Sequence, residues 1–565
     1  MHENRFDTLP EGKDAPFETT IDTLRARLLD LGVDVEERAF LNPTEGVWSV
    51  NLAMAGCPGL FTNGKGTSRD AALASAYGEL FERLTTGYLF SDLYLPLREE
   101  DGFGYEPREV WLEDLESAKL EALTPELWEF YDPEDETEEV HLLDFNTGGE
   151  RGICALPFVD EAGAQVLFPV AILENLYVSN GMAAGNTFLE ARVQALSEVL
   201  ERYVKNKIIA DGLCLPDVPE EVLAEYPLVV DGIAEMEKSG LRITVKDASL
   251  GGRFPVMCVV AANTNDGGVF AAFGAHPRFG VALFRTFTEM FQGRSELSGF
   301  PFPSMDADLV ASPGNLEEHF VDSAGLLHWD FFKGTPDHAF VRWGVGRGVS
   351  REEEYAMLAE AVHGEEGVIY SWESEHLGMP CCRLVVPGMS EIYPVEDFIW
   401  ENRGRQVRFR EGLLALSSWD RASAEAFFEL AEDGAFAPET LVCEVAGIAG
   451  TNPWQDVAVA EVAAWAAFKA EAFEDAARWF GVAGRLEVPM TRKLYHQAME
   501  AMLMASSEGE VSPDISRVLP GAVVKAVVET LENGAFLPIS KVSFGALLTL
   551  GEHGHIAERV GRFRK

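Results

Sequence analysis

Two stretches of this chain repeat one pattern: residues 66–83 read GTSRDAALASAYGELFER, and residues 185–202 read GNTFLEARVQALSEVLER. Each begins with a glycine, continues with a hydroxyl residue that could cap a helix and with small residues, and ends in the run E-x-x-E-R. The matching acids Glu79 and Glu198 are 119 positions apart, and so are Glu82 and Glu201. The pattern predicts two helices of an internal repeat, which could pack about a pseudo-twofold axis.

The four repeated glutamates indicate a site for a hard cation. Residues three apart are neighbours on a helix surface, so each helix presents both of its acids on one face. Four carboxylates on two facing helices repel one another unless cations lie between them. Oxygen donors without histidine favour Mg²⁺ first, and Mn²⁺ or Ca²⁺ next. Mg²⁺ usually shares itself with substrate phosphates, so the pattern indicates a nucleotide.

The alternative is that each E-x-x-E run is an ordinary solvated helix face, as expected by chance in a chain with 93 acidic residues. Three features favour a shared, buried site instead. The two helices begin with matching residues, both runs end in arginine, and the glutamates have apolar neighbours.

Further candidates surround these glutamates. Ser75 and Gln194 lie one turn earlier on the same two faces. A third helix, expected over residues 279–292, carries Arg285, which suits bidentate phosphate contact, and Glu289 one turn later. A structural salt bridge explains that spacing equally well. Lys65 lies just before the first helix, where the helix N-terminus favours anions, and a solvated loop lysine is the alternative.

Two other patterns point to no chemistry. Residues 59–66, GLFTNGKG, nearly match a P-loop, but Gly66 stands where Ser or Thr would hold Mg²⁺, so we expect a turn-rich passage instead. The adjacent Cys381 and Cys382 could form a redox pair, yet we interpret them as reduced core cysteines. The scattered histidines show no ligand spacing, and nothing points to a Ser-His-Asp or Cys-His hydrolase.

The composition indicates a globular protein with a strongly negative field. The 565 residues include 45 Lys and Arg against 93 Asp and Glu, a net charge of −48, and 47% are hydrophobic. Such a field repels phosphate backbones and anionic membranes, so we expect no direct nucleic-acid or membrane partner. No apolar run approaches the roughly 20 residues of a membrane helix, and residues 1–16 carry no secretory signal. We therefore expect a cytoplasmic location.

The order of elements predicts an α+β main domain followed by an all-α region. Alanine-rich helices with aromatic residues begin near residue 439 and resemble stacked tetratricopeptide hairpins, although no clean repeat of about 34 residues is present. We place the domains at residues 1–437, with a core over about 60–400, and at residues 438–565. We expect helices over residues 19–31, 69–85, 187–209 and 279–292, and strands over residues 47–54, 242–246, 256–263, 269–273, 368–372 and 382–386.

Taken together, these motifs resemble the YcaO family, and more closely its enterobacterial YcaO-like branch with a helical C-terminal extension. The resemblance covers most of the chain, less clearly residues 105–139 and the C-terminal helices. It rests on the two E-x-x-E-R helices, on Arg285 to Glu289 and on five short motifs: NGKG (63–66), NLYVSNGM (175–182), AGNT (184–187), GAHP (274–277) and FGVAL (279–283).

The resemblance implies a YcaO-type domain, unlike kinases or P-loop proteins, that uses ATP and Mg²⁺ to activate a peptide-backbone amide by phosphorylating its oxygen, after or alongside attack by a nucleophile on the carbon. We predict catalytic roles for Arg202, Arg285 and Glu289. The residues predicted to hold Mg²⁺ are Glu79, Glu82, Glu190, Glu198, Glu201 and Glu289. Those predicted to contact ATP are Lys13, Thr20, Lys65, Ser75, Asn186, Gln194, Arg202 and Arg285.

The similar enterobacterial branch implies a role in β-methylthiolation of an aspartate in a ribosomal small-subunit protein, a methylthiotransferase partner and a homodimer. We do not expect azoline formation, because azoline-forming relatives end in a proline-rich tail and this chain ends in GRFRK (561–565). The alternative to an amide-activating enzyme is a non-catalytic accessory protein that scaffolds a methylthiotransferase and keeps a regulatory nucleotide site. A third hypothesis, an acidic helical-repeat adaptor, predicts no nucleotide binding.

Overall fold

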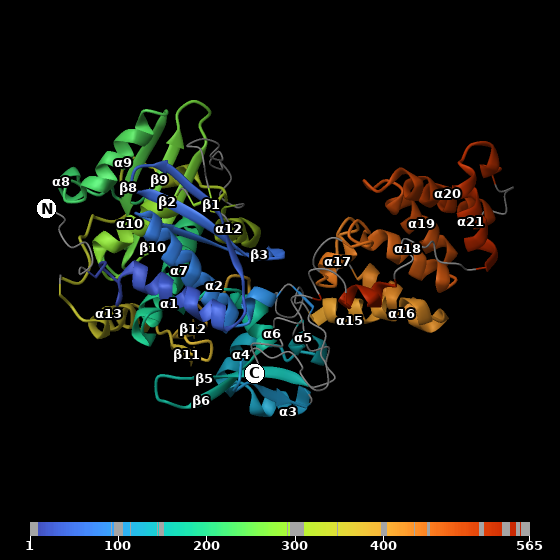
Figure 1. Ribbon diagram of the computed structural model, residues 1–565, viewed down its shortest axis with the longest axis horizontal. Coiled ribbons are helices and arrows are strands. Elements are labelled where there is room, and N and C mark those ends of the chain that lie inside the picture. The colour runs from blue at the N-terminus through green and yellow to red at the C-terminus, as the bar shows by residue number, and fades with distance from the viewer. Residues whose placement is uncertain are drawn as a thin grey trace. The chain divides into compact units, whose positions relative to one another are not determined.

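A computed structural model describes the chain, which divides into two compact units (Figure 1). The first comprises Met1–Leu89, Gly104–Glu136 and Cys154–Trp400, and the second comprises Phe90–Phe103, Thr137–Ile153 and Glu401–Lys565. The domain boundary predicted near residue 437 stays a prediction. The structure describes residues 9–91, 93–94, 106–113, 115–143, 145, 152–290, 292–293, 310–321, 323–346, 348–396, 404–433, 436–448, 452–507, 513–533, 543–549 and 554.

The first unit mixes helices and strands, as predicted. Its elements are α1 (Phe17–Asp30), β1 (Val35–Thr44), β2 (Val47–Met54), β3 (Cys57–Gly66), α2 (Arg69–Thr85), β4 (Val110–Leu112), α3 (Leu115–Glu121), α4 (Pro125–Tyr131), β5 (Ile153–Val159), β6 (Gln165–Pro169), α6 (Val170–Ile172), the π-helix η2 (Leu173–Tyr177), β7 (Met182–Ala184), α7 (Phe188–Ala210), α8 (Glu220–Leu223), α9 (Pro227–Glu237), β8 (Leu241–Asp247), β9 (Val256–Asn263), β10 (Val269–Ala275), α10 (Phe279–Glu289), α12 (Pro313–Val321), η3 (Trp329–Phe332), α13 (Arg351–His363), β11 (Tyr370–Ser374) and β12 (Cys381–Val385).

The strands of this unit form three sheets. Two of them are antiparallel and three-stranded, with the orders β1-β2-β3 and β10-β9-β8. The third has the order β4-β5-β11-β12-β7, with β6 paired to β5. Strands β2 and β9 begin and end where the sequence predicts.

Three long helices each lie between two of these sheets. Helix α2 packs against β2 and β3 on one side and against β7 and β12 on the other. Helix α7 packs against β7 and β12 and also against β9 and β10, and α10 packs against β9 and β10 and also against β2 and β3. Sheets and helices therefore alternate in a ring, and all three helices line one cavity inside it.

The prediction of a turn-rich passage over residues 59–66 is wrong, because these residues belong to strand β3. Thr62 and Gly64 face α2: the Thr62 hydroxyl donates to the Ala76 carbonyl at 3.0 Å, and a Cβ on Gly64 would lie 2.0 Å from the Ala72 carbonyl oxygen. The glycine thus allows the strand to approach the helix closely and makes no turn. Lys65, on the opposite side of the strand, faces the cavity, so it is not a loop lysine.

The second unit is helical, as predicted. Successive helices pack on one another, α16 on α18, α18 on α19, α19 on α20 and α20 on α21, and the rings of Trp465 and Phe480 fill the spaces beside small alanines. The tetratricopeptide-like arrangement stays a prediction. The elements are α5 (Glu139–Leu142), α15 (Gly404–Leu414), η4 (Leu416–Ser418), α16 (Arg421–Glu432), α17 (Val442–Val445), α18 (Val459–Lys469), α19 (Phe473–Ala483), α20 (Met490–Ser507), η5 (Ile515–Arg517), α21 (Gly521–Asn533) and η6 (Phe544–Thr549).

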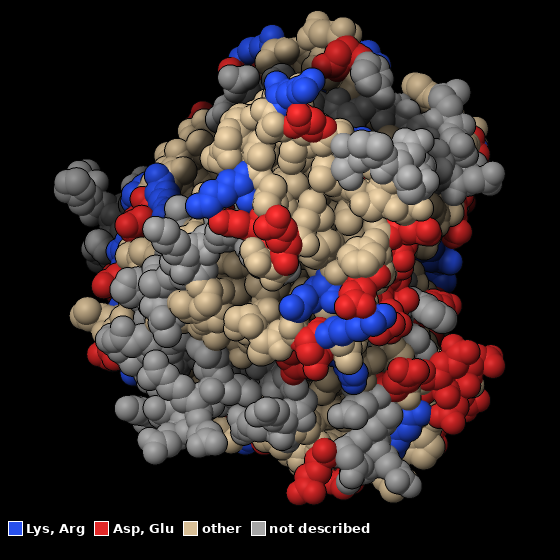
Figure 2. All heavy atoms as spheres, turned by 90° about the vertical axis from the view of Figure 1, so that its right-hand side faces the viewer, with Lys and Arg blue, Asp and Glu red and all other residues tan. Residues whose placement is uncertain are grey.

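The surface and the cysteines agree with the composition. On the face shown in Figure 2, acidic side chains gather along the right-hand side, and the basic ones occur in small groups close to acidic ones. All seven cysteines are buried and none forms a disulfide, and burial raises the pKa of Cys381 to about 12, which supports a packing role for the Cys381–Cys382 pair. Across the described part of the chain, no helix combines the length and apolarity needed to cross a bilayer.

Candidate functional site

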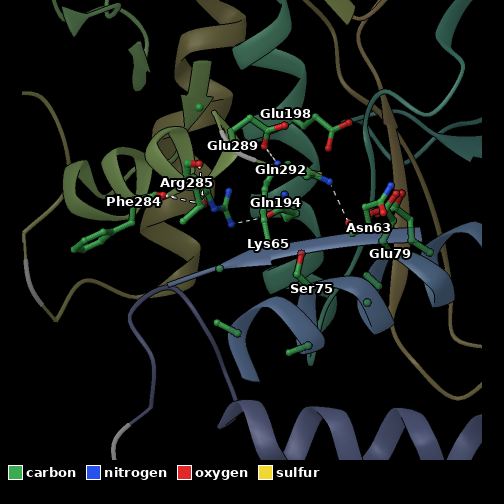
Figure 3. A pocket seen from close by; sticks show the side chains of 18 of the residues that line it. Asn63, Lys65, Ser75, Glu79, Gln194, Glu198, Phe284, Arg285, Glu289 and Gln292 are labelled. Carbon is green, nitrogen blue, oxygen red and sulfur yellow. Dashed lines mark hydrogen bonds and ion pairs between the residues drawn. The ribbon is translucent and has the colours of Figure 1, made fainter. Parts of the chain in front are cut away.

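The first unit contains a cavity of about 1050 Å³, lined by strand β3, by helices α2, α7 and α10, and by the segment before α1. The close-up shows how the labelled side chains of β3, α2, α7 and α10 lie in this cavity (Figure 3). Every residue that the sequence predicts for the site lines this cavity: Lys13, Thr20, Lys65, Ser75, Glu79, Glu82, Asn186, Glu190, Gln194, Glu198, Glu201, Arg202, Arg285 and Glu289.

The repeated helix entries have a common physical basis. Ser68 caps α2 by accepting a hydrogen bond from the Ala71 N–H at 3.1 Å, and Thr187 caps α7 by accepting one from the Glu190 N–H at 3.0 Å. A Cβ on Gly66 would lie 2.7 Å from the Ala72 nitrogen, and a Cβ on Gly185 would collide with α7 in the same way. The predicted glycine and hydroxyl signals are therefore confirmed as helix-start signals.

Each repeat supplies acids together with its own arginine. In α2, Arg83 pairs with Glu79 through Nη2 and Oε1 at 3.5 Å and with Glu82 through Nε and Oε1 at 3.2 Å. In α7, Arg202 Nη2 lies 3.0 Å from Glu198 Oε1. The two halves of the site thus present the same charges in the same order along the helix.

Helix α10 and strand β3 contribute two further cations. Lys65 of β3 forms an ion pair with Glu289 of α10, and Arg285 donates a hydrogen bond to the side chain of Gln194 in α7 (Figure 3). Arg285 also donates to the Ala275 carbonyl at 3.3 Å. These contacts join the third helix to strand β3 and to the second repeat across the cavity.

Burial in this cavity disfavours charge on five of these groups. It raises the pKa of Glu79, Glu82 and Glu201; for Glu82, the neighbouring carboxylates of Glu198 and Glu79 add to the effect, and its pKa reaches about 8. Burial also lowers the pKa of Lys65 and Arg285. The resident cations therefore do not fully compensate the acids.

The donor set fits a hard divalent cation. All the candidate ligands are carboxylates, and their mutual repulsion would be relieved by a doubly charged ion. In the described residues, no three His, Cys, Asp or Glu side chains are already arranged to hold a metal ion. Five of the six acids instead pair with lysine or arginine, and Glu201 accepts a hydrogen bond from the Ala275 N–H at 3.2 Å. An incoming ion would therefore replace some of those ion pairs.

The segment before α1 meets the start of α7 at one end of the cavity. Lys13 Nζ lies 3.1 Å from Glu190 Oε1, and the Asp14 N–H donates to Glu190 Oε2 at 2.8 Å. Asn186 donates to the same carboxylate at 3.0 Å and accepts from the Thr20 hydroxyl at 2.9 Å. The predicted residues Lys13, Thr20, Asn186 and Glu190 therefore form one connected group.

Several residues that line the cavity were not predicted from the sequence. Arg83 was not a candidate, although it stands 119 positions before Arg202, and this offset could have identified it. Asn63 could have been found from its alternation with Lys65 along β3. Gln292, whose side chain donates to the Asn63 carbonyl at 3.3 Å, and Ser179 carried no signal of chemistry. Residues 561–565, on which the azoline prediction depends, lie outside the described residues.

Comparisons with known proteins identify the family of this chain. A family model described as YcaO cyclodehydratase, ATP- and Mg²⁺-binding, matches residues 63–390, and one described as YcaO cyclodehydratase C-terminal domain matches residues 406–537. The chain is 42% identical over 520 residues to the ribosomal protein S12 methylthiotransferase accessory factor YcaO of Escherichia coli (strain K12), covering 90% of this chain and 88% of that protein.

Two further matches are more limited. An uncharacterized protein of Haemophilus influenzae is 46% identical over 429 residues, covering 75% of this chain and 73% of that protein. The solved structure of YcaO from Methanopyrus kandleri bound with AMPPCP and Mg²⁺ is 19% identical, with a TM-score of 0.42, and covers 67% of this chain and 92% of that one.

The first family model matches more than half of the chain and names both ligands that the sequence predicts. ATP and Mg²⁺ are therefore confirmed as the ligands of this kind of domain. With both family models and the relative in Escherichia coli in agreement, the chain belongs to the YcaO family.

Proposed function

We propose that this protein is an ATP- and Mg²⁺-dependent enzyme that activates a backbone amide of a peptide or protein by phosphorylating the amide oxygen. One observation carries the proposal: acids and cations from α2, α7 and α10, which are far apart in the sequence, line a single cavity of about 1050 Å³. A cavity of this volume is at the upper end of the range for small-molecule sites and accommodates a nucleotide.

The cavity residues divide by chemistry into metal ligands and phosphate ligands. Bound Mg²⁺ would neutralise the negative charge that develops on the transferred phosphoryl group. Arg202 and Arg285 would donate hydrogen bonds to phosphate oxygens, since the guanidinium group matches phosphate geometry. The carboxylates that would hold the metal are those of Glu79, Glu82, Glu190, Glu198, Glu201 and Glu289.

The remaining predicted residues would orient the nucleotide. Lys13 and Thr20 would lie at its adenosine end, and Asn186, which already contacts Thr20 and Glu190, would connect that end to the metal ligands. Ser75, Gln194 and Lys65 would contact the phosphates or position the groups that do. Glu289, paired with Lys65, would complete the catalytic set with Arg202 and Arg285.

Phosphorylation solves a specific chemical problem of amides. When a nucleophile bonds to the amide carbon, the oxygen gains negative charge but is a poor leaving group. Transfer of the γ-phosphoryl group to that oxygen converts it to a phosphate ester, and the C–O bond then breaks with phosphate as the leaving group. Each step needs the charge stabilisation that an acid- and arginine-lined site can provide.

We further propose a role in β-methylthiolation of a ribosomal small-subunit protein, because the Escherichia coli relative is named as an accessory factor of the S12 methylthiotransferase. In this proposal the protein is a cytoplasmic homodimer, and its helical second unit recruits the methylthiotransferase or a second copy. The same name favours a second candidate, a non-catalytic scaffold for the methylthiotransferase with a regulatory nucleotide site.

Nucleotide turnover separates the two candidates. ATP hydrolysis is measured with and without ribosomal protein S12, for the wild type, for Glu82→Ala and for the control Glu425→Ala, which changes an exposed acid of α16. If the protein is an enzyme, ATP hydrolysis should depend on S12. Glu82→Ala should lose both this hydrolysis and methylthiolation in cells, and Glu425→Ala should keep both. A Glu82→Ala protein that supports full methylthiolation in cells would favour the scaffold.

A further inference from the structure

The segment before α1 is held to the body of the first unit by a chain of charged groups. The Asp14 carboxylate accepts a hydrogen bond from the Thr187 hydroxyl at 2.6 Å through one oxygen and from Arg351 Nε at 2.9 Å through the other. Three residues earlier, Glu11 lies 3.5 Å from Arg278 Nη1. The segment is therefore tied to the start of α7 and to two arginines.

Both arginines converge on one acid in the first turn of α13. The Glu354 side chain is fully buried, and its two oxygens pair with Arg278 and Arg351 respectively. Arg278 also donates to the Val349 carbonyl at 2.9 Å. A buried carboxylate shared by two arginines fixes both guanidinium groups in position, because leaving any of the three charges unpaired would be costly.

This arrangement reaches the cavity through the backbone of the segment. Asp14 donates its N–H to Glu190, and the neighbouring Lys13 pairs with the same carboxylate, which is only 4% exposed. Arg351 and Glu354 themselves do not line the cavity. Their link to the segment that lines the cavity runs from Arg351 to Asp14 and from Arg278 to Glu11.

We infer that Arg351 and Glu354 are positioning residues for the nucleotide, acting through Asp14 to hold Lys13 and Glu190 in their binding positions. The inference rests on the proposed function. A segment that is held in place before the ligand arrives loses less conformational freedom on binding, so the affinity is higher. Without the Arg351 contact, Asp14 and Lys13 would be held by Thr187 and by Glu190, and Glu190 is a group that the metal would take.

The experiment measures binding of ATP with Mg²⁺ by calorimetry, and amide hydrogen exchange of residues 10–20, in full-length variants. We expect Arg351→Gln to weaken binding about 10-fold, as is typical for residues that orient metal ligands, and to speed exchange in the segment. Arg351→Lys, which keeps the charge, should recover part of the affinity. The matched control is Arg342→Gln, which breaks an exposed arginine pair with Glu225 elsewhere in the same unit.

A double variant tests the route of the effect. If Arg351 acts through Asp14, then Arg351→Gln combined with Asp14→Asn should bind no more weakly than Asp14→Asn alone. Glu354→Gln should reproduce the loss of ATP affinity and the faster hydrogen exchange. Both are measured at a temperature well below the melting temperature of this variant.

Three outcomes would count against the inference. Arg351→Gln that binds ATP as the wild type does would overturn it and leave the proposed function intact. Fully additive losses in the double variant would overturn the route through Asp14. Wild-type protein that binds no ATP with Mg²⁺ would overturn the proposed function, and this inference with it.

Discussion

Both units of this protein bury acids beside cations, but they do so in opposite ways. In the helical unit, Glu461 of α18 is fully enclosed and contacts Arg492 Nε at 3.1 Å, His496 Nε2 at 2.7 Å and the Ala458 N–H at 3.1 Å. In the first unit, carboxylates from α2, α7 and α10 line an open cavity, with fewer cations than acids among the predicted residues. The first arrangement is closed, and the second is open and short of positive charge.

The difference separates an ionic cluster that supports the fold from one that is ready for a ligand. A closed cluster leaves no room for a further charge, so its removal should affect folding alone. An open cluster with raised carboxyl pKa values, such as that of Glu82 at about 8, gains when a divalent cation enters. Neutralising one of its acids should therefore affect binding alone.

The largest effect is expected from the closed cluster. Glu461→Gln leaves the buried Arg492 without one of its two counter-charges, and we expect it to lower the stability of the second unit by about 3 kcal/mol. Thermal unfolding and hydrogen exchange in α18 and α20 measure this loss, and calorimetry should find ATP affinity unchanged. A stable Glu461→Gln protein with weakened ATP binding would erase the distinction between the two clusters.

The open cluster should show the converse. Glu198→Gln removes one carboxylate charge, and we expect Mg²⁺-dependent ATP binding to weaken at least about 100-fold, or about 2.7 kcal/mol, with no loss of thermal stability. The control Glu235→Gln changes an exposed acid of α9. Strong metal-dependent binding that survives Glu198→Gln would contradict the assignment of the metal ligands.

Arg83 offers a pH-dependent test of the repeat. Its charge lowers the pKa of Glu82, so Arg83→Gln should raise that pKa further above 8. Mg²⁺ must then displace a proton that is held more tightly, and a rise of about one pKa unit weakens binding about 10-fold near pH 7. The deficit should shrink as the pH rises toward 9. If the loss of ATP affinity in Arg83→Gln did not change with pH, we would infer that Arg83 contacts the phosphates instead.

The smallest effect concerns His319, a buried histidine of the first unit that pairs with no acid among the described residues, whereas His496 pairs with Glu461. Burial, reinforced by the nearby Lys205 charge, lowers the pKa of His319 to about 4. As the pH falls, His319 takes up a proton near pH 6.5 in the unfolded chain but only near pH 4 in the folded chain. The free energy of unfolding therefore decreases as the pH falls through this range.

Between pH 6.5 and about pH 5.5 we expect a loss of about 1 kcal/mol from His319. His319→Gln should flatten the dependence of thermal stability on pH, whereas the control His363→Gln, at an exposed position, should not. An unchanged slope in His319→Gln would place the acid sensitivity elsewhere.

Much of the cavity was predictable because the repeat encodes it locally. Helix caps, glycine entries and E-x-x-E-R runs act over four to seven residues, and Ser68, Thr187 and the paired glutamates behave as those rules require. The prediction of a turn-rich passage over residues 59–66 was wrong, because the sequence does not distinguish a glycine that lets a strand pack closely against a helix from a glycine that makes a turn.

Arg351 could not be assigned from the sequence, because its partner Asp14 is 337 positions away and neither residue stands in a motif. Gln292 was missed for a similar reason, since its contact to Asn63 joins segments 229 positions apart. No local pattern records which acid a distant arginine will meet.

The sequence by itself determined the family, the alternation of helices and strands, and the residues that carry charge into the cavity, because short-range hydrogen bonding and helix periodicity govern these features. Only the tertiary structure decided that three sheets and three helices alternate in a ring, and which cation meets which acid inside it. Those choices depend on distances between elements far apart in the chain, which packing sets.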